Sequence, residues 1–259
     1  MVMTTTLQTR QTHRIDHAII AAPPLPREHG AWGILLIPFA TAVGISGIID
    51  LKIALLLLSV LSFYVARTSY LRGHAIWTSV LLAISVACVG PLLFVWKLWW
   101  LAAFGAVAAL LAFRKTERSL MMQLLAVGGL TLTAPAARYT AIGHLDSRAL
   151  LLWLLNAFYF AGGVFYVKMH VAAAMRRGDR KIRLGAPVLI YYTALSCVLL
   201  AMASRHLISF SVLTAYVTVV ARALVGVMTL SPVLRIKRLG WTEVGHSLVY
   251  AVLLIVTMH

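Results

Sequence analysis

Long apolar runs, separated by short polar connections, make up most of this chain. Nine of them are candidate membrane spans, because an α-helix needs about 20 mostly apolar residues to cross about 30 Å of hydrocarbon. They are residues 31–49, 52–71, 76–96, 98–113, 119–142, 149–171, 185–204, 207–231 and 241–258. The alternation typical of a barrel strand is absent, and a backbone in lipid must pair its polar groups internally. The pattern therefore predicts helices.

These runs predict an all-α fold, a polytopic membrane helix bundle of about nine transmembrane helices. A polar arm, residues 1–28, precedes a single transmembrane domain, residues 29–259. The connections between the runs are too short to contain a separate soluble domain. The arm lacks the apolar core of a signal peptide, so we expect the first apolar run to remain as a span.

Composition excludes two other classes of protein. Of the 259 residues, 61% are hydrophobic and 12% are charged, whereas soluble domains are about 45–50% apolar and about 25% charged. The net charge of +16 would suit a nucleic-acid binder, but the basic residues lie between apolar runs. A soluble nucleic-acid-binding protein and a disordered chain are thereby excluded. Cys88 and Cys197 lie far apart inside apolar runs, which favours packing roles over a disulfide or a cysteine-ligated metal.

The basic residues predict the orientation of the bundle. Seventeen of them lie in the arm and in the connections after spans two, four, six and eight, and five lie on the opposite side. Because cytoplasmic loops carry the excess of Lys and Arg, we expect the N-terminus in the cytoplasm and the C-terminus outside. The five on the opposite side are Lys52, Lys97, Arg138, Arg148 and Arg205.

Arg222 is the remaining basic residue and lies inside the eighth span. An arginine at that depth costs at least ~2.5 kcal/mol unless it faces the bundle interior and finds a partner. Glu243, at the start of the ninth span, is the simplest counter-ion. Two interpretations stay open, a structural Arg222–Glu243 pair and an arginine that binds a ligand.

Two further motifs contain acid–base groups. Arg27, Glu28 and His29 precede the first span and form either a polar cluster at the membrane surface or a simple helix start. Glu243 and His246 lie three positions apart, on one helical face. A Glu-x-x-His unit occurs in di-iron sites, but the second copy is missing here. The histidines show no haem-like arrangement, so we expect no metal, haem or other cofactor.

The cytoplasmic connections are the second candidate site. Arginine forks bind phosphate in a bidentate manner, and residues 176–183 are the densest basic run of the chain. With residues 64–74 they would form an electropositive mouth for an anionic head group. Setting the topology and contacting anionic lipid is the simpler interpretation of any one loop charge. The candidate ligand-binding residues are Arg27, Arg67, Arg72, Arg118, Lys168, Arg176, Arg180, Arg222 and His246; the candidate acid–base residues are Glu28, His29, Glu117 and Glu243.

The segment Pro-Arg-Glu-His-Gly-Ala-Trp, residues 26–32, resembles the signature of the YwiC-like family of bacterial integral membrane proteins. Further blocks of the resemblance lie at residues 114–120, 134–139, 165–168 and 240–247. The resemblance implies a multi-span protein of the bacterial cytoplasmic (inner) membrane and brings no defined activity with it.

A more distant resemblance is to the UbiA-type prenyltransferases, which are also nine-helix membrane proteins. It implies a UbiA-like arrangement of helices, in which aspartate-rich loops after helices two and six bind a prenyl diphosphate through Mg²⁺. This chain has polar loops at both places, but no two of its seven acidic residues lie closer than 12 positions apart. We therefore expect the arrangement without magnesium–diphosphate coordination.

Three functions remain open. The first is a non-canonical, UbiA-like enzyme or binding protein for an isoprenoid, quinone-like or other lipid with an anionic head group. The second is a transporter of a small anion or lipid, with Arg222 and the glycines of Ala161-Gly162-Gly163 lining its pathway. The third is an accessory protein that assembles with a membrane complex. The first leads, because the topology and the polar loops match a lipid-active architecture. The oligomeric state is not predicted.

Overall fold

The computed structural model describes residues 29–112, 119–175, 181–231 and 236–259, with the backbone only for residues 29, 112 and 236–238. Within these residues the chain is helical and contains no strand. The helices are α2 (His29–Ser46), α3 (Leu51–Leu71), α4 (Ala75–Phe94), α5 (Trp100–Ala112), α6 (Leu120–Leu130), α7 (Thr133–Ile142), α8 (Ser147–Met175), α9 (Lys181–Ser204), the short 3₁₀ helix η1 (Phe210–Val212), α10 (Leu213–Met228) and α11 (Ile236–Met258). The polar arm predicted for residues 1–28 lies outside the described residues.

The described helices confirm the predicted polytopic membrane bundle. Seven helical spans are long and apolar enough to cross a membrane, and two shorter apolar helices cover Gly30–Ser46 and Trp100–Leu111. These nine segments correspond to the nine predicted spans. The main differences are at α8 and α11, which extend beyond the apolar runs to Met175 and Ile236. The added turn of α8 is Ala172-Ala173-Ala174-Met175, and the added residues of α11 include Lys237 and Arg238. All of these residue types favour helices, so they prolong the two spans.

The fifth span consists of two helices, α6 and α7, that follow one another with a break at Thr131 and Leu132. Pro135 has no backbone N–H and cannot donate to the carbonyl four residues earlier, which prevents a continuous helix. The Thr133 hydroxyl, at the break, donates to the Leu35 carbonyl of α2 at 2.9 Å. The break thus fastens α7 to the first span. Gly143, with φ of 82°, then ends α7 in the left-handed conformation that glycine adopts easily.

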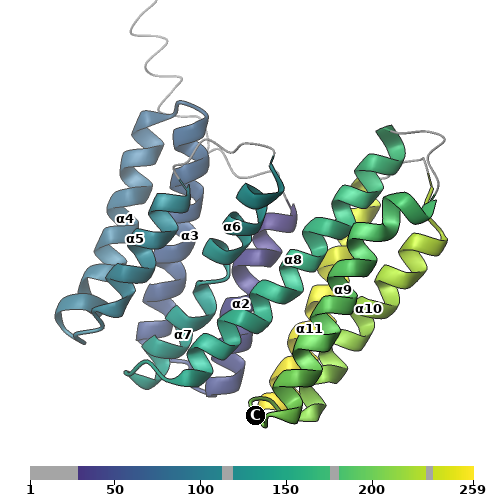
Figure 1. Ribbon diagram of the computed structural model, residues 1–259. Helices are drawn as coiled ribbons and strands as arrows, with labels where there is room; N and C mark the ends of the chain where they lie inside the picture. The colour runs from purple at the N-terminus through teal and green to yellow at the C-terminus, as the bar shows by residue number, and fades with distance from the viewer. Residues whose placement is uncertain (1–28, 113–118, 176–180, 232–235) are drawn as a thin grey trace, which may run out of the picture.

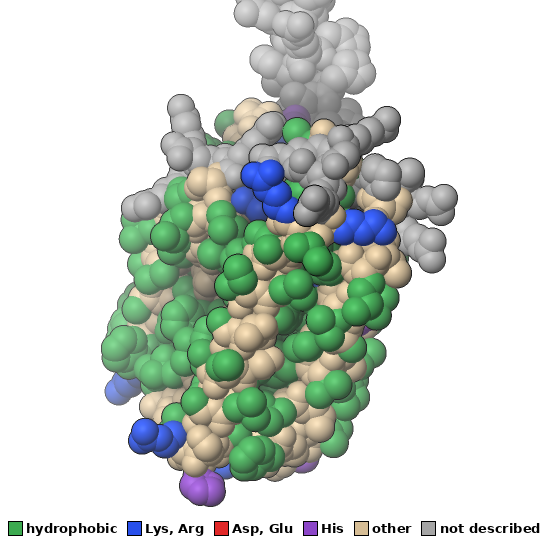
Figure 2. Space-filling view, turned by 45° about the vertical axis from the view of Figure 1, so that its right-hand side comes forward, with side chains coloured by type: hydrophobic (Ala, Val, Ile, Leu, Met, Phe, Trp, Pro, Cys, Tyr) green, Lys and Arg blue, Asp and Glu red, His purple; other side chains and the backbone are tan. Residues whose placement is uncertain are grey.

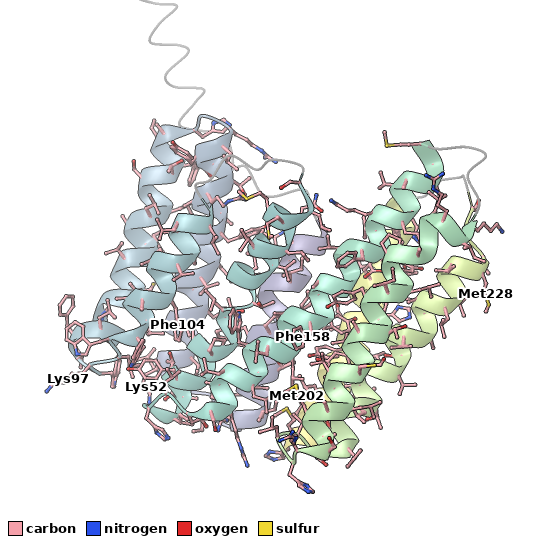
Figure 3. The ribbon with its side chains drawn as sticks, viewed as in Figure 1. Lys52, Lys97, Phe104, Phe158, Met202 and Met228 are labelled. Atoms are coloured by element: carbon pink, nitrogen blue, oxygen red, sulfur yellow. The ribbon has the colours of Figure 1, made fainter. Side chains whose placement is uncertain are left out.

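Successive spans run in opposite directions, so the chain termini of the bundle lie at opposite ends (Figure 1). We call the end where α2 begins the N-terminal end and the end where α11 finishes the C-terminal end. The five basic residues that the sequence placed opposite the arm all lie near the C-terminal end, with Lys52 and Lys97 labelled there in Figure 3. The segregation of charge to two ends follows the predicted topology.

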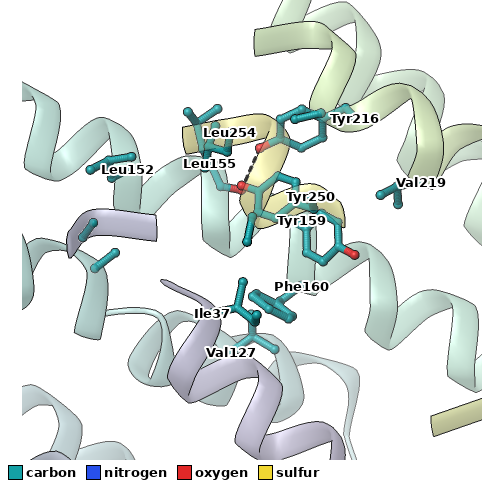
Figure 4. Packing of buried hydrophobic residues seen from close by; sticks show 14 of the residues in the cluster. Ile37, Val127, Leu152, Leu155, Tyr159, Phe160, Tyr216, Val219, Tyr250 and Leu254 are labelled. Carbon is teal, nitrogen blue, oxygen red and sulfur yellow. Dashed lines mark hydrogen bonds between the residues drawn. The ribbon is translucent and has the colours of Figure 1, made fainter. Parts of the chain in front are cut away.

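The bundle has two halves, α2–α7 and α8–α11 (Figure 1). The N-terminal half is built on the long α3–α4 pair, and the C-terminal half packs α8 on α9 and α10 on both α9 and α11. Helix α2 joins the halves, because it packs against α7 on one side and against α11 and α8 on the other. Buried side chains form one core through both halves, including Ile37 and Phe160 across the joint (Figure 4).

The lateral surface is apolar. In Figure 2 hydrophobic side chains cover the visible face between its two rims, and Lys and Arg lie toward the rims. The turn between α4 and α5, at the C-terminal end, exposes Trp96, Trp99 and Trp100. Tryptophan gathers where the acyl chains of a bilayer meet the head groups. This surface is the one expected of a multi-pass membrane protein.

Candidate functional site: a buried arginine–glutamate pair

Arg222 on α10 and Glu243 on α11 form an ion pair inside the C-terminal half. The Arg222 Nη1 and Glu243 Oε1 atoms are 2.6 Å apart, and the two side chains are 8% and 20% exposed. Arg222 lies six residues before the end of α10, which at 1.5 Å per residue is about 9 Å along the helix axis. The predicted pairing of this intramembrane arginine with Glu243 is confirmed.

Tyr166 on α8 covers the guanidinium. The Arg222 Cζ atom stands 4.4 Å from the centre of the Tyr166 ring, a cation–π contact. Gly226, one turn after Arg222, makes room for that ring, because a Cβ there would lie 2.5 Å from Tyr166 Cε2. The close approach of α8 and α10 thus depends on a glycine.

Two further glycines, both on α8, lie against the same region. A Cβ on Gly162 would stand 2.5 Å from the Tyr192 hydroxyl of α9, and one on Gly163 would stand 3.5 Å from Glu243 Oε2. In the transporter hypothesis, Gly162, Gly163 and Arg222 line one pathway. The structure brings the glycines and the ion pair together at one site.

Several polar atoms of this site are buried without a hydrogen-bond partner. One of them is Arg222 Nε, whereas Arg222 Nη1 and Glu243 Oε1 face each other at 2.6 Å in the ion pair. The hydroxyls of Tyr159, Tyr192 and Tyr250 are also buried without a partner. Buried polar groups are normally hydrogen-bonded, so an unpartnered cluster suggests bound water, an ion or a ligand. We call these five residues the Arg222 cluster.

Stacked tyrosines continue from the Arg222 cluster toward the C-terminal end. The rings of Tyr159 and Tyr250 stack with centres 3.9 Å apart, and Tyr216 meets Tyr250 edge-on at 5.5 Å. The Tyr216 hydroxyl donates to the Leu155 carbonyl at 2.7 Å (Figure 4). The row is therefore tied to the backbone at its far end and has unpartnered hydroxyls near the ion pair.

The structure describes four further predicted site residues, His246, Arg67, Arg72 and Lys168. His246 Nδ1 lies 2.7 Å from the Thr242 carbonyl oxygen of its own helix, which accepts from it. In the described part of the chain no group of His, Cys, Asp and Glu has metal-site geometry. Arg67 and Arg72 lie at the end of α3, in the other half of the bundle, and each interacts with neighbouring groups. Lys168 is half-buried on α8.

The remaining predicted site residues are not described. The side chain of His29 and the whole of Arg27, Glu28, Glu117, Arg118, Arg176 and Arg180 lie outside the described residues. The electropositive mouth between residues 64–74 and 176–183 therefore stays a prediction.

A second buried ion pair lies at the C-terminal end. Arg138 on α7 donates from Nε to both carboxylate oxygens of Asp146 at 3.0 Å and from Nη2 at 2.6 Å. Asp146 also accepts from the Ala149 backbone N–H at the start of α8. Partial burial alone would raise the pKa of Asp146, but these hydrogen bonds and the charge of Arg138 hold the pKa below its usual value. All these contacts lie between α7 and α8, so the pair is structural.

Sequence reasoning missed the phenols of the Arg222 cluster. Their signal was present, because Tyr159, Tyr192 and Tyr250 lie inside apolar runs, whereas membrane tyrosines usually lie at span ends. Periodicity alone does not show which of these residues face one another. That depends on how α8, α9 and α11 pack.

The helices and the buried Arg222–Glu243 pair define a polytopic α-helical membrane protein with a charged site within its C-terminal half. Residues 25–138 match the family model described as YwiC-like protein. The chain is also 30% identical, over 159 residues, to "Uncharacterized protein YwiC" of Bacillus subtilis (strain 168). The chain is thus similar to the YwiC-like family over these residues.

The matches have defined extents. The alignment to the Bacillus protein covers 56% of this chain and 65% of that protein, slightly under two thirds of its length. No solved structure matches the chain. The likeness to UbiA-type prenyltransferases stays a prediction.

Proposed function

We propose that this protein binds the anionic head group of an isoprenoid or other membrane lipid inside its C-terminal half, with Arg222 as the anion's partner. The observation that carries the proposal is the group of buried donors beside the ion pair, Arg222 Nε and the hydroxyls of Tyr159 and Tyr192, which have no hydrogen-bond acceptor. A guanidinium fork matches the oxygen pairs of carboxylate and phosphate groups. An anionic head group supplies those acceptors.

The surroundings of Arg222 suit such a head group. The hydroxyls of Tyr159 and Tyr192 are buried and unpartnered, and each is able to donate to an anion. Tyr166 covers one face of the guanidinium and Glu243 holds Nη1, which leaves Nε for the ligand. The lateral surface of the bundle is apolar (Figure 2), so a hydrocarbon tail has a place in the lipid-facing region.

The proposed function is binding. The proposed site lies inside the bundle, whereas the sequence predicted it in the cytoplasmic loops. We propose that the basic loops attract the anionic lipid first, with the N-terminal end in the cytoplasm of a bacterial cell. Lys181 and Arg183, exposed at the start of α9, belong to that end. Among the predicted acid–base residues, Glu243 is the one that would lie beside the bound group.

A second candidate function, transport of a small anion or lipid, is favoured by one specific observation. Gly162 and Gly163 let Tyr192 and Glu243 lie close against α8, so polar groups of α9 and α11 meet beside the intramembrane Arg222. Flux of a labelled anion into proteoliposomes, lost when Arg222 is neutralised, would distinguish transport from static binding.

Native mass spectrometry of the gently purified protein, followed by identification of the extracted lipids, tests the proposal. We expect a defined anionic lipid to be retained by the wild type and lost in the double variant Arg222→Gln/Glu243→Gln, in which no buried charge is left alone. Arg205→Gln is the matched control, because it removes an exposed arginine of the same half at the opposite, C-terminal end. Release of bulk phospholipid alone, equal in all three proteins, would overturn the proposal.

A further inference from the structure

We infer that anion binding at Arg222 is coupled to the uptake of one proton by Glu243. This inference rests on the proposed function and specifies how the same site is loaded. Without ligand, the guanidinium and the carboxylate neutralise one another at 2.6 Å. The ligand-free site therefore carries no net charge.

A bound anion changes that balance. Two negative groups would then share one guanidinium, and the buried site would carry a net charge of about −1 in a medium where unpaired charge is costly. Neither side chain is able to move its charge to water easily, since they are 8% and 20% exposed. Uptake of a proton by Glu243 restores neutrality.

The step is balanced in charge and atoms. The Arg222–Glu243 ion pair, the incoming anion and one proton from bulk water become an Arg222–anion pair and a neutral Glu243 carboxyl group. The neutral carboxyl has an O–H, which is able to donate to the bound anion. Glu243 thus changes from a competitor for the guanidinium into a hydrogen-bond donor to the ligand.

The groups around Glu243 make it the proton acceptor. Arg222 stays protonated, and the tyrosine hydroxyls are neutral donors near physiological pH. Helix α2, which packs on α11, has His29 as its one titratable residue, with an undescribed side chain. The other titratable groups near the site are Tyr159, Tyr166 and His170 on α8, Tyr191 and Tyr192 on α9, Tyr216 on α10, and His246 and Tyr250 on α11.

His246 and His170 are the groups that compete with Glu243 for this role. Each has Nδ1 against a carbonyl of its own helix, Thr242 at 2.7 Å and Tyr166 at 3.0 Å. Glu243, by contrast, contacts the Arg222 guanidinium directly at 2.6 Å. The unpartnered hydroxyls of Tyr159, Tyr192 and Tyr250 offer sites for water molecules that bring the proton.

The test uses an alkanesulfonate below its micelle concentration as the probe, because its sulfonate stays ionised throughout the range studied. We measure its affinity for the detergent-solubilised full chain by calorimetry from about pH 5 to about pH 9. In the wild type, affinity should fall about tenfold per pH unit where Glu243 is ionised, the slope that uptake of one proton requires. Glu243→Gln should bind tightly with no slope, and Arg222→Gln/Glu243→Gln should not bind.

Direct measurement of proton uptake removes the dependence on variants. Mixing wild-type protein and probe in weakly buffered solution should take up about one proton per sulfonate bound. Binding that depends on Arg222 but shows neither a pH slope nor proton uptake would overturn this inference and leave the proposed function standing. Equal binding by the double variant would overturn both. A slope removed by His246→Gln and kept by Glu243→Gln would overturn the assignment to Glu243.

Discussion

Asn156 of α8 donates from Nδ2 to the Thr41 hydroxyl oxygen of α2 at 3.3 Å, across the joint between the two halves. Both side chains are fully buried. Thr41 in turn donates to the Pro38 carbonyl at 2.8 Å, so its hydroxyl is oriented to accept from Asn156. A polar contact between residues 115 positions apart thus links the first span to the sixth.

This contact predicts an energetic coupling between the halves. In a double-mutant cycle of Thr41→Val and Asn156→Leu, we expect a coupling free energy of unfolding of about 0.6 kcal/mol and at most about 1.7 kcal/mol. The measurement is unfolding in mixed detergent micelles. Thr68→Val, which removes a hydroxyl bonded within α3, is the control and should show no coupling to Asn156→Leu. Additive effects at positions 41 and 156 would contradict the prediction.

The Arg222–Glu243 pair predicts non-additive effects on stability. Arg222→Gln or Glu243→Gln alone leaves one buried charge without a partner, and we expect each to lower the free energy of unfolding by about 3–5 kcal/mol. The double variant should recover most of that loss, because both charges are gone. Thermal unfolding in detergent checks this. Single variants as stable as the wild type would show that the pair is hydrated rather than buried.

The close packing of Gly226 against Tyr166 predicts that a larger residue at position 226 disturbs the cation–π contact with Arg222. In Gly226→Ala the new methyl group must displace the Tyr166 ring, since the Cβ would lie 2.5 Å from Cε2. We expect weaker binding of the alkanesulfonate probe and a lower unfolding temperature. Gly245→Ala on α11 is the matched control, because its Cβ meets nothing within 4 Å. A smaller side chain in Tyr166→Leu should relieve the clash in the double variant.

The Arg138–Asp146 ion pair predicts that the folded protein loses stability at low pH. Its pKa in the folded protein lies below the usual value, despite partial burial, because Arg138 and the Ala149 N–H stabilise the carboxylate. The stabilisation is therefore present above the ordinary aspartate pKa of about 3.9 and is lost as the pH falls through the lower folded value. Unfolding temperatures measured down to about pH 3 should fall less steeply for Asp146→Asn than for the wild type. An equal fall of the unfolding temperature with pH in both proteins would contradict this role of Asp146.

The charge distribution predicts which end faces the cytoplasm. In a background without Cys88 and Cys197, a cysteine at Lys97 should react with a membrane-impermeant thiol reagent added to intact cells. A cysteine at Arg183 should react only after lysis, because it lies at the opposite end of the bundle. The reverse labelling would invert the predicted topology.

The positions of the spans were predictable from the sequence. Which side chains contact one another inside the bundle was predictable only for charged residues. Apolar length alone marks a span, because lipid admits little else than a hydrogen-bonded helix. The two helices of the fifth span were predicted as one, since α6 and α7 form a continuous apolar run. Arg222 was paired correctly because an isolated buried charge is so costly that few acidic residues qualify.

The amino-acid sequence by itself thus determined the class, the number of spans, the segregation of basic residues and the Arg222–Glu243 pair, all of which follow from local composition and the cost of charge in lipid. Only the tertiary structure decided that Tyr166 covers Arg222, that Gly226 and Gly162 admit tyrosines, and that the hydroxyl of Tyr192 is left without a partner. A single contact between neutral side chains is too weak for the sequence to show which residues meet across two helices. Their contacts depend on how the spans rotate and approach when they pack.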